Sequence, residues 1–519
     1  MNLSLKTCIF INANVITLDP LFPKADWVAV HDAKIVKVGH GIDWKAIKES
    51  RFEVIDLGGK TILPGFIDAH MHIVATVKKY LSLDLTPGKK VRSISDIESM
   101  IHDYSLNIPP GKWIFGKGYN EFYLSEKRFP NRWDLDKATL NHPVKLTHRS
   151  GHTHVLNSLA LKLTGITKET GDPDGGMIDR NLITGEPTGI LYEMADSLAE
   201  RIQPLQQDEL EPGLQMLNRK LLSSGITSIH DASHRNDANR WNLLNSWKSC
   251  GKLKPRINMM AGYPSFRNNE HNFLSESPDQ NQLKLGAIKI MLDDTTGRML
   301  PTQKELNNMV LKVHKAGMQV AFHAIEEASI DAACYAVKVA TEKVSGNEHR
   351  HRIEHCSVCP SSLAKKIASL KMMVVTQPPF IFHSGERYLE TVRKEQLKHL
   401  YPIRTLLSHG IAVAGSSDSP VVHPDPLIGI YAAISRLAEN DFVVGEHQKI
   451  SVMDALRMYT QYAAQASFEE TIKGTITPGK LADLVVLNGD PTHLSPKDFR
   501  NLKVEMTIIG GEVVWTRDH

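Results

Sequence analysis

The sequence lacks long apolar runs. None of its 519 residues lie in a stretch that reaches the roughly 18 consecutive apolar residues of a transmembrane helix. The opening segment "MNLSLKTCIFINANVITLDP" also lacks the order of basic segment, apolar segment and small-residue cleavage site that an export signal needs. We therefore expect no membrane partner and a cytoplasmic location.

Cysteine is scarce, and its distribution excludes a disulfide framework. The five cysteines are odd in number and widely scattered: Cys8, Cys250, Cys334, Cys356 and Cys359. That pattern fits a reducing compartment. Cys356 and Cys359 have the spacing of half a zinc knuckle or of a redox pair. Because no second pair accompanies them, an ordinary structural role is favoured.

The chain also lacks a strong charge of either sign. It has 61 Lys and Arg against 58 Asp and Glu, for a net charge of +3. No long basic run with interleaved aromatic residues suggests nucleic-acid binding, so a small-molecule substrate is expected. A hydrophobic content of 41% and a charged content of 23% are ordinary for a globular protein. The sequence does not decide between a monomer and a homo-oligomer.

Short strand-like runs occupy both ends of the chain. Near the N-terminus, turns at His31-Asp32 and Gly58-Gly59 separate "CIFINANVITL", "WVAVHDAKIVKVG" and "FEVIDLGGKTIL". Near the C-terminus, "ADLVVLNGD" and "VEMTIIGGEVVWTR" repeat this style, with a hairpin turn at Gly510-Gly511. We predict one small β-sandwich domain built from residues 1–62 and 474–519.

The central residues 63–473 alternate strand-like segments with amphipathic, helix-compatible ones. Eight strand-like segments occur: "GFIDAHMH", "VKLTHR", "GITSIHDA", "GAIKIMLDD", "MQVAFHA", "HRIEHC", "MMVVTQPP" and "IAVAGSSD". This pattern predicts the α/β class and a (β/α)8 TIM-like barrel. The interval after the first strand is too long for one crossover. We expect an insertion there, at about 76–142, and a second excursion at about 165–215.

The stretch "TILPGFIDAHMHI" places His70 and His72 two residues apart after an apolar run. In a β-strand, whose side chains alternate, both imidazoles face the same side. Buried imidazoles need partners, and a divalent metal such as zinc accepts both lone pairs at once. Taken alone, the pair could equally be two core histidines, so its interpretation depends on the other strands.

Polar residues recur where the other strands end. In strand order these residues are His148, Arg149, His230, Asp231, Lys289, His323, His355, Gln377 and Asp418. The active site of such a barrel lies at the carboxyl ends of its strands. Independent core histidines would have no reason to recur at this one level, so the pattern predicts a metal site at the barrel opening.

These motifs resemble the amidohydrolase superfamily over nearly the whole chain. "PGFIDAHMH" is similar to its strand-one metal motif, "AFHA" and "IEHC" to its histidines of strands five and six, and "GSSDSP" to its strand-eight aspartate. Within the superfamily, "GHTHVLNSLAL", "GEPTGILYE" and "SFEETIKGTITPGKLADLVVL" resemble the branch of YtcJ-like proteins and N-substituted formamide deformylase. The resemblance implies a metal-dependent hydrolase.

The expected cofactor is one or two divalent ions per chain, with zinc foremost. His70, His72 and Asp418 would hold one ion, and His323 and His355 a second. The resemblance implies that a lysine at the end of strand four bridges two metals as an N6-carboxylysine, which here is Lys289. A lysine directed toward solvent is the alternative, and Glu193 is a rival bridging ligand.

Asp418 is also the expected proton shuttle, because a metal ligand that hydrogen-bonds the reacting water can take its proton and pass it to the leaving amine. His152 or His230 could stabilise the developing oxyanion, and Arg404 could anchor a polar substrate group. Plainer roles stay open, namely loop structure for His152 and a surface salt bridge for Arg404.

The predicted activity is hydrolysis of a carbon–nitrogen bond other than a peptide bond, in a small amide or N-substituted formamide. Deamination, cyclic-amide opening and ester hydrolysis stay open on the same site. Two further alternatives are a non-catalytic regulatory or binding protein that retains the barrel, and a lyase or isomerase that uses a single metal.

Overall fold

The structure is a computed structural model that describes residues 7–46, 53–88, 90–173, 175–268, 279–293, 299–346 and 348–517. The chain divides into two compact units. The first comprises residues 1–73 and 218–519, and the second comprises residues 74–217. No helix among the described residues is both long and apolar enough to cross a membrane.

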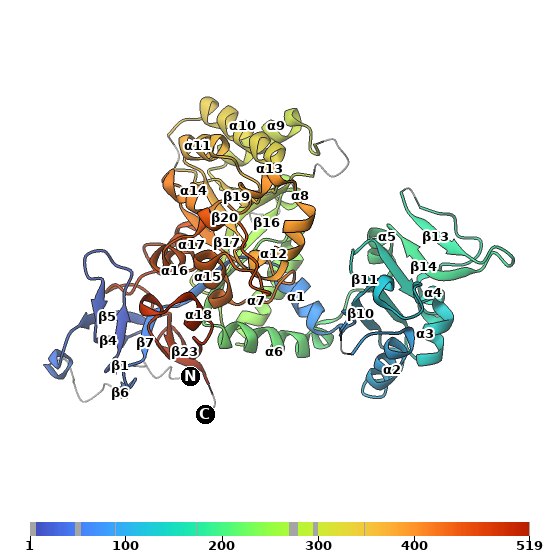
Figure 1. The fold of residues 1–519 in the computed structure, drawn as a ribbon, viewed down its shortest axis with the longest axis horizontal. Helices are drawn as coiled ribbons and strands as arrows, with labels where there is room; N and C mark the ends of the chain where they lie inside the picture. Colours follow the sequence, from blue (N-terminus) through green and yellow to red (C-terminus); the bar gives the residue numbers. More distant parts are fainter. Residues whose placement is uncertain are drawn as a thin grey trace. The chain divides into compact units, whose positions relative to one another are not determined.

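An eight-stranded parallel sheet forms the centre of the first unit (Figure 1). In sequence order its strands are β8 (Phe66–Met71), β15 (Ile226–Asp231), β16 (Arg256–Gly262), β17 (Leu283–Met291), β18 (Val320–Ala324), β19 (Arg352–His355), β20 (Met373–Thr376) and β21 (Val413–Gly415). The first and last strands meet where the backbone N–H of Asp418 donates to the His70 carbonyl at 2.8 Å. The predicted barrel is therefore confirmed.

Helices follow the barrel strands along the chain, as the alternating pattern predicts. In α9 the buried Leu306, Val310 and Val313 recur at helical spacing, and the Glu305 side chain accepts the Thr302 N–H at its start. The helices of this unit that follow β15 are α7 (Ala238–Ser249), α8 (Tyr263–Arg267), α9 (Gln303–Lys315), α10 (Glu327–Lys343), α11 (Ser361–Ser369), α12 (Pro379–Thr391), α13 (Lys394–Leu397), α14 (Ile403–Ser408), α15 (Pro426–Ser435), α16 (Val452–Met458), α17 (Gln461–Gln465) and α18 (Pro496–Phe499).

Two further sheets complete the first unit. Strands of the N-terminal segment form one sheet, and strands of both terminal segments form the other. One has the order β5 (Lys34–Gly39), β4 (Trp27–His31), β1 (Cys8–Ile11), β6 (Glu53–Asp56). The other has the order β24 (Glu512–Thr516), β23 (Val504–Ile509), β22 (Leu484–Leu487), β7 (Thr61–Pro64), β2 (Asn14–Ile16), β3 (Lys24–Ala25). Phe10 and Val28 of the first sheet share one buried core with Ile62, Leu484 and Ile508 of the second, which confirms the β-sandwich.

A buried ion pair joins this sandwich to the barrel. The Arg256 guanidinium, at the start of β16, donates to both carboxylate oxygens of Asp483 at 2.6 and 2.9 Å. Both side chains are almost fully buried. The hairpin between β23 and β24 turns at Gly510 and Gly511, which have φ values of 56° and 76°. Such positive φ angles favour glycine, so this turn forms where the sequence predicts it.

The second unit has its own six-stranded sheet. The order is β13 (Met177–Arg180), β14 (Pro187–Tyr192), β12 (Thr153–Leu156), β11 (Val144–His148), β10 (Ile114–Tyr119), β9 (Leu83–Asp84). Helices α2 (Ile94–Ser105), α3 (Arg132–Ala138), α4 (Ser158–Thr164) and α5 (Ala195–Arg201) belong to it, and α1 (Ile73–Tyr80) and α6 (Gln207–Ser223) precede and follow this set along the chain.

One strand assignment was wrong. "VKLTHR" forms β11 in the sheet of the second unit, and so its His148 and Arg149 do not end a barrel strand. The missing barrel strand is β16, between β15 and β17. Its sequence "RINMMAG" is buried throughout and carries no polar residue at its carboxyl end. It therefore lacked the polar residue at its end by which the other barrel strands could be predicted. Strand β11 does end in a histidine, His148, and so had the same pattern as a barrel strand.

Candidate metal centre

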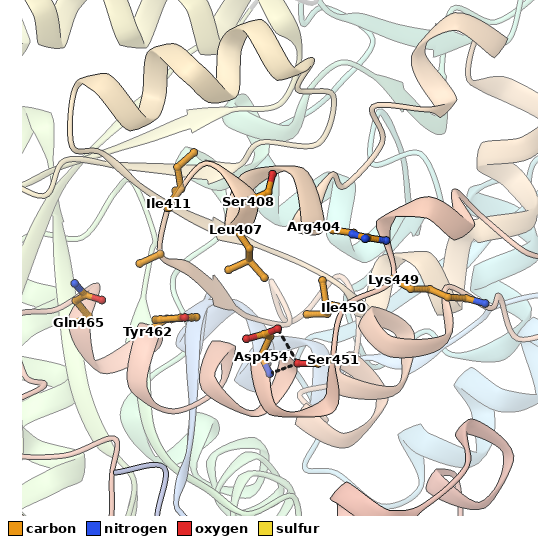
Figure 2. Close-up of a pocket in the computed structure, with 12 residues that line it drawn as sticks. Arg404, Leu407, Ser408, Ile411, Lys449, Ile450, Ser451, Asp454, Tyr462 and Gln465 are labelled. Carbon is orange, nitrogen blue, oxygen red and sulfur yellow. Dashed lines mark hydrogen bonds between the residues drawn. The ribbon is translucent and has the colours of Figure 1, made fainter. Parts of the chain in front are cut away.

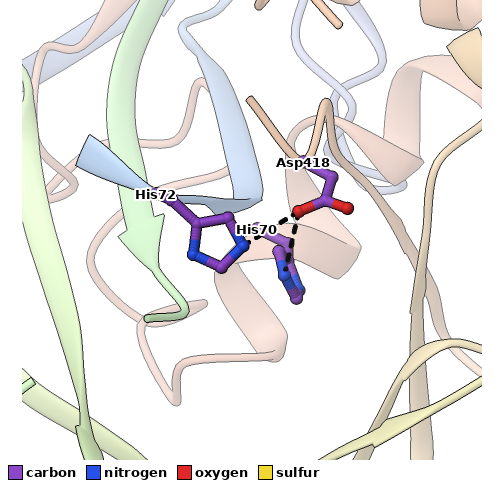
Figure 3. Close-up of side chains that lie close together, drawn as sticks. All are labelled: His70, His72 and Asp418. Atoms are coloured by element: carbon purple, nitrogen blue, oxygen red, sulfur yellow. Dashed lines mark ion pairs between the residues drawn. The ribbon is translucent and has the colours of Figure 1, made fainter. Parts of the chain in front are cut away.

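Strand β8 and the segment after β21 bring His70, His72 and Asp418 together (Figure 3). Asp418 Oδ1 lies 3.4 Å from His70 Nε2 and 3.0 Å from His72 Nε2. One ligand atom from each residue falls within 4.8 Å of the others. The two-residue spacing of the histidines therefore places both on one side of β8, and Asp418, with φ of 54°, turns toward them from the end of the barrel.

The donor atoms of this cluster fit a divalent cation. Among the described residues, the buried His70 Nε2 has no hydrogen-bond partner, and Asp418 Oδ1 lies at ion-pair distance from the imidazoles of His70 and His72. Buried polar atoms are normally satisfied, so an unsatisfied imidazole nitrogen that faces a carboxylate oxygen indicates a missing partner. Two imidazoles and one carboxylate form a ligand set that zinc and related transition ions accept.

His323 and His355 lie beside this cluster. His355 Nε2 is 2.9 Å from His323 Nδ1, and His355 Nδ1 is 3.9 Å from Asp418 Oδ2. Burial lowers the pKa of His323 to about 4 and holds that of His355 well below 6.5. Both rings are therefore neutral at pH 7, the form in which imidazole binds a metal.

Lys289, near the end of β17, is buried in the same barrel interior. Its side chain is almost inaccessible, and among the described residues its Nζ has no hydrogen-bond partner. Burial lowers the pKa of Lys289 to about 8, although the negative charges of Glu354 and Asp418 act in the opposite direction. The alternative of a solvent-directed lysine is wrong, because the amine lies inside the barrel.

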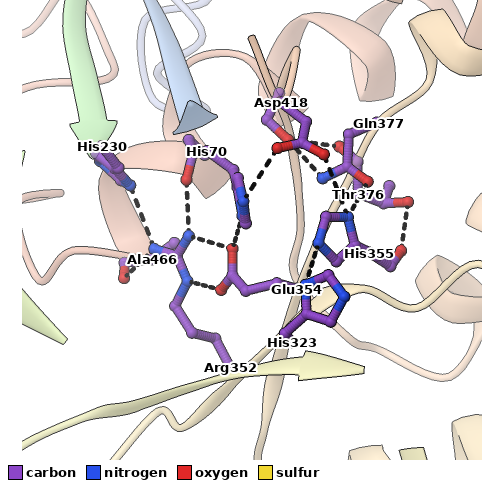
Figure 4. Close-up of polar contacts among 12 residues, drawn as sticks. His70, His230, His323, Arg352, Glu354, His355, Thr376, Gln377, Asp418 and Ala466 are labelled. Carbon is purple, nitrogen blue, oxygen red and sulfur yellow. Dashed lines mark hydrogen bonds and ion pairs between the residues drawn. The ribbon is translucent and has the colours of Figure 1, made fainter. Parts of the chain in front are cut away.

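Two buried residues that the sequence did not mark, Glu354 and Arg352, lie beneath the histidines (Figure 4). His70 Nδ1 lies 2.5 Å from Glu354 Oε2, and both side chains are fully buried. Arg352 donates to both oxygens of the same carboxylate, at 2.5 and 3.0 Å. Burial raises the pKa of Glu354, but the charges of Arg352 and Lys289, together with the Arg352 hydrogen bonds, outweigh burial and hold that pKa below 4.5. The carboxylate is thus ionised and accepts a hydrogen bond from His70 Nδ1.

His72 and His355 also have a polar partner on the second ring nitrogen. His72 Nδ1 lies 3.1 Å from Ser233 Oγ, which donates to Asp231 Oδ1 at 2.6 Å. His355 Nδ1 lies 2.9 Å from Gln377 Oε1. Such partners fix the tautomer and the ring orientation of a metal ligand. Gln377 ends a barrel strand in the sequence, but nothing in the sequence marks the role of Ser233.

A cavity of about 430 Å³ opens beside His323, His355 and Asp418. Its other walls are mostly apolar or aromatic, and its lining includes Ile325, Val358, Phe380, Val392, Leu400 and Val421. Tyr388 and Tyr401 also line it, with their hydroxyl oxygens 3.1 Å apart. The cluster therefore borders a space that can hold a small molecule.

Arg404 and His230, two of the four predicted accessory residues, lie in the first unit but outside the cluster of His70, His72 and Asp418. Arg404 is exposed and lines a different pocket with Ser408, Lys449 and Asp454 (Figure 2). His230 is fully buried, with its Nδ1 3.2 Å from Arg352 Nη1. Burial and the Arg352 charge keep the pKa of His230 well below 6.5.

His152 and Glu193 belong to the second unit, where His152 Nδ1 lies 2.9 Å from Glu193 Oε2. Both side chains are more than half exposed there. The structure thus pairs the predicted oxyanion-stabilising histidine with the predicted rival metal bridge. Their roles at the metal centre stay predictions.

Comparisons with known proteins agree with this geometry. Residues 53–515 match the amidohydrolase family. The chain is 28% identical to YtcJ of Bacillus subtilis (strain 168), whose name assigns it to the amidohydrolases, over 90% of this chain and 91% of that protein. It is also 28% identical to the N-substituted formamide deformylase of Arthrobacter pascens, over 99% of each. An uncharacterised metal-dependent hydrolase from Pyrococcus horikoshii OT3 shares the fold, with a TM-score of 0.78 at 22% identity over 95% of this chain and 99% of that one.

Proposed function

The chain belongs to the amidohydrolase family, and we propose from this premise that it hydrolyses a carbon–nitrogen bond, other than a peptide bond, in a small amide or N-substituted formamide. The observation that carries the proposal is the convergence of His70, His72 and Asp418 at the carboxyl end of the barrel, beside a cavity. The name of the Arthrobacter relative supports the formamide as the first substrate class to test. The cytoplasmic location stays a prediction.

His70, His72 and Asp418 would hold one divalent ion, with zinc as the ion that this ligand set favours. His323 and His355 would contribute to a second position. A metal bound there supplies a Lewis acid that polarises the substrate carbonyl and lowers the pKa of a water. The supporting observations are the buried His70 Nε2, which has no hydrogen-bond partner among the described residues, and the Asp418 carboxylate that faces it.

Asp418 would move the proton of the reaction. One carboxylate oxygen, Oδ1, faces His70 and His72, which leaves Oδ2 on the side of His355. From there Oδ2 can accept the proton of the attacking water and later donate it to the leaving amine. Burial alone would raise the pKa of Asp418, but His72 and His355 lower it, so the carboxylate begins the cycle ionised.

Lys289 would carry the bridging group as an N6-carboxylysine. Its ammonium would first lose one proton, and the neutral amine would then form a bond to the carbon of carbon dioxide and release a second proton, which leaves an anionic carbamate in place of a buried cation. The proposal is supported by a buried Nζ that has no hydrogen-bond partner among the described residues. It also removes the repulsion between an ammonium group and a metal ion.

The cavity supports a substrate with an apolar substituent. Binding removes apolar surface of the substrate from water, and its burial against these carbon-rich walls is favourable by about 25 cal/mol per Å². The Tyr388 and Tyr401 hydroxyls provide one polar contact in this lining. We therefore place the apolar substituent of the amide against Phe380 and Leu400, with the carbonyl toward Asp418.

The test combines metal content with a substrate series. Protein purified without added metal or chelator is analysed for elemental content and intact native mass, and then assayed on N-alkylformamides of increasing chain length. We expect one or two zinc ions per chain, the added mass of one carbon dioxide, and a KM that falls as the alkyl chain of the substrate lengthens.

Metal-loaded protein that hydrolyses none of these amides would overturn the formamide assignment and direct the assay to deamination and cyclic amides. Protein that takes up no metal would leave the non-catalytic binding protein as the better interpretation.

A further inference from the structure

The buried side chains beneath the metal centre form a directed network. Arg352 and Glu354 are two residues apart along β19, so their side chains point to the same side of the strand, into the barrel interior. His355, the next residue, has φ of 76° and departs from the extended backbone. This departure lets adjacent residues of one strand serve the same centre, with His355 at the opening and Glu354 below it.

Arg352 has an acceptor for each of its N–H groups. Beside its two bonds to Glu354, Nη2 donates to the Ala69 carbonyl at 2.7 Å. Nη1 donates to His230 Nδ1 at 3.2 Å and to the Ala466 carbonyl at 3.3 Å. The guanidinium therefore fixes the carboxylate and also the backbone of β8 directly before His70.

This network determines which nitrogen of His70 carries hydrogen. An ionised carboxylate only accepts hydrogen bonds, so the hydrogen of His70 is on Nδ1, which lies 2.5 Å from Glu354. Nε2 is then left with its lone pair, directed toward Asp418. The partner on Nδ1 thus prepares Nε2 as a metal ligand.

We propose that Glu354 and Arg352 are positioning residues that set the metal affinity of the centre by holding His70 in this tautomer and orientation. The inference rests on the proposed function, because it requires that His70 binds a metal. It is independent of the substrate and can be measured without turnover. The competing interpretation is a buried ion pair that stabilises the barrel and has no influence on the metal.

The substitution Glu354→Gln separates these interpretations, because an amide cannot satisfy both neighbours. If its oxygen faces His70, its NH2 group opposes the donors of Arg352. If its oxygen faces Arg352, its NH2 group opposes the Nδ1 hydrogen and favours the tautomer with hydrogen on Nε2. Loss of such a partner typically weakens metal affinity about 10–100-fold.

The same barrel provides a matched control in Glu469. Its side chain is also buried, lies 3.0 Å from the Lys473 ammonium and accepts the Ser467 hydroxyl at 2.7 Å. Lys473 in turn donates to Ser228 of β15. E469Q therefore removes a buried carboxylate from an ion pair in the barrel, and its partners among the described residues, Lys473 and Ser467, are not candidate metal ligands.

The experiment titrates Zn²⁺ into the full-length protein in competition with a chromophoric chelator, for wild type, E354Q and E469Q. Cobalt(II) loading adds a visible spectrum that reports ligand geometry. We expect E354Q to bind zinc about 10–100-fold more weakly with an altered cobalt spectrum, and E469Q to match wild type. Equal affinities and spectra in all three proteins, or equal losses in both variants, would overturn the inference.

A second variant keeps the test usable if E354Q does not fold. R352K retains the charge but loses the two-pronged contact, so zinc affinity should fall while the carboxylate is still present. Wild-type affinity in R352K would show that Arg352 does not position the centre. A wild-type protein that binds no zinc would overturn the proposed function and this inference together, whereas zinc binding that is insensitive to both substitutions overturns the inference alone.

Discussion

Asp418 combines two roles that a single substitution can separate. Its Oδ1 faces the two histidines of β8, and its Oδ2 is the proposed proton acceptor. Asp418→Asn keeps an oxygen that can bind a metal but removes the ability to hold and return a proton. We expect turnover to fall by at least about 10²–10⁴-fold, which is the usual contribution of general acid–base catalysis. Metal content should fall less than in His70→Ala.

Initial rates and elemental analysis of both variants check this prediction. His70→Ala serves as the comparison, because it removes a ligand and leaves the carboxylate in place. If both variants lose the same fraction of their metal, Asp418 acts mainly as a ligand and the proton-shuttle role is wrong. If D418N retains metal and turns over like wild type, another group moves the proton.

At the residue scale, the sequence marks the side chains at the barrel opening but not those that support them. His70, His72 and Asp418 could be predicted because their spacing and their place after apolar strands are visible along the chain. Glu354 could not, because its partner His70 is 284 positions away. A buried carboxylate in a strand becomes interpretable only when the fold shows which imidazole it contacts.

At the element scale, a chain of hydrogen bonds ties helix ends to strand starts away from the metal centre. Val320, at the start of β18, donates its N–H to His351 Nδ1 at 3.0 Å. His351 Nε2 therefore carries the hydrogen and donates to His314 Nδ1 at 3.0 Å, and His314 Nε2 donates to the Val344 carbonyl after α10. The bond from Val320 requires a lone pair on Nδ1 and therefore a neutral ring at His351.

This arrangement predicts a pH-dependent stability. Burial, with the neighbouring His349 and His314, holds the pKa of His351 well below 6.5. Below about pH 6.5 the unfolded chain binds a proton at this residue and the folded chain does not. Protonation thus favours unfolding, and the free energy of unfolding should fall by up to about 1.4 kcal/mol per pH unit from this residue as pH drops from 6.5 to 5.

Denaturant unfolding at several pH values tests this with His351→Asn. The asparagine oxygen can still accept the Val320 N–H, but the donor to His314 is lost, so we expect a less stable protein with a shallower pH dependence between pH 6.5 and 5. The control is H493N, since the His493 side chain is 72% exposed. An H351N protein with the wild-type slope would contradict the prediction.

The elements themselves were predictable to different degrees. Seven barrel strands were identified because each carries a polar residue where its apolar body ends. The strand β16 lacks such a residue and was missed, and β11 ends in His148 and was wrongly included. Strand β11 pairs with β10 and β12, and nothing within its own five residues distinguishes that sheet from the barrel.

At the scale of the whole molecule, the metal centre lies at the seam of the barrel. Beside the Asp418 bond to His70, the N–H of His72 donates to the Ser419 carbonyl at 2.7 Å, and Asp68 Oδ1 accepts the Ser417 N–H at 3.0 Å. The candidate ligands on the two sides of this seam are His70 and His72, at the end of β8 and directly after it, and Asp418, in the segment after β21. A bound metal would therefore link the first strand to the last.

Metal removal should consequently loosen the seam more than the rest of the barrel. A ligand that binds only the folded state adds about 4.1 kcal/mol of stability at a concentration 1,000 times its Kd, and this contribution disappears with a chelator. Repulsion among the unshielded donor atoms should concentrate the loss of stability near β8 and β21.

Hydrogen exchange followed by mass spectrometry should show faster exchange in peptides covering residues 66–72 and 413–419 after chelation, with recovery on adding zinc. Peptides from β16, a barrel strand that carries no candidate metal ligand and pairs with β15 and β17, serve as the internal control. Uniform acceleration over both regions would indicate that the metal stabilises the fold globally, and unchanged exchange at the seam would place the metal elsewhere.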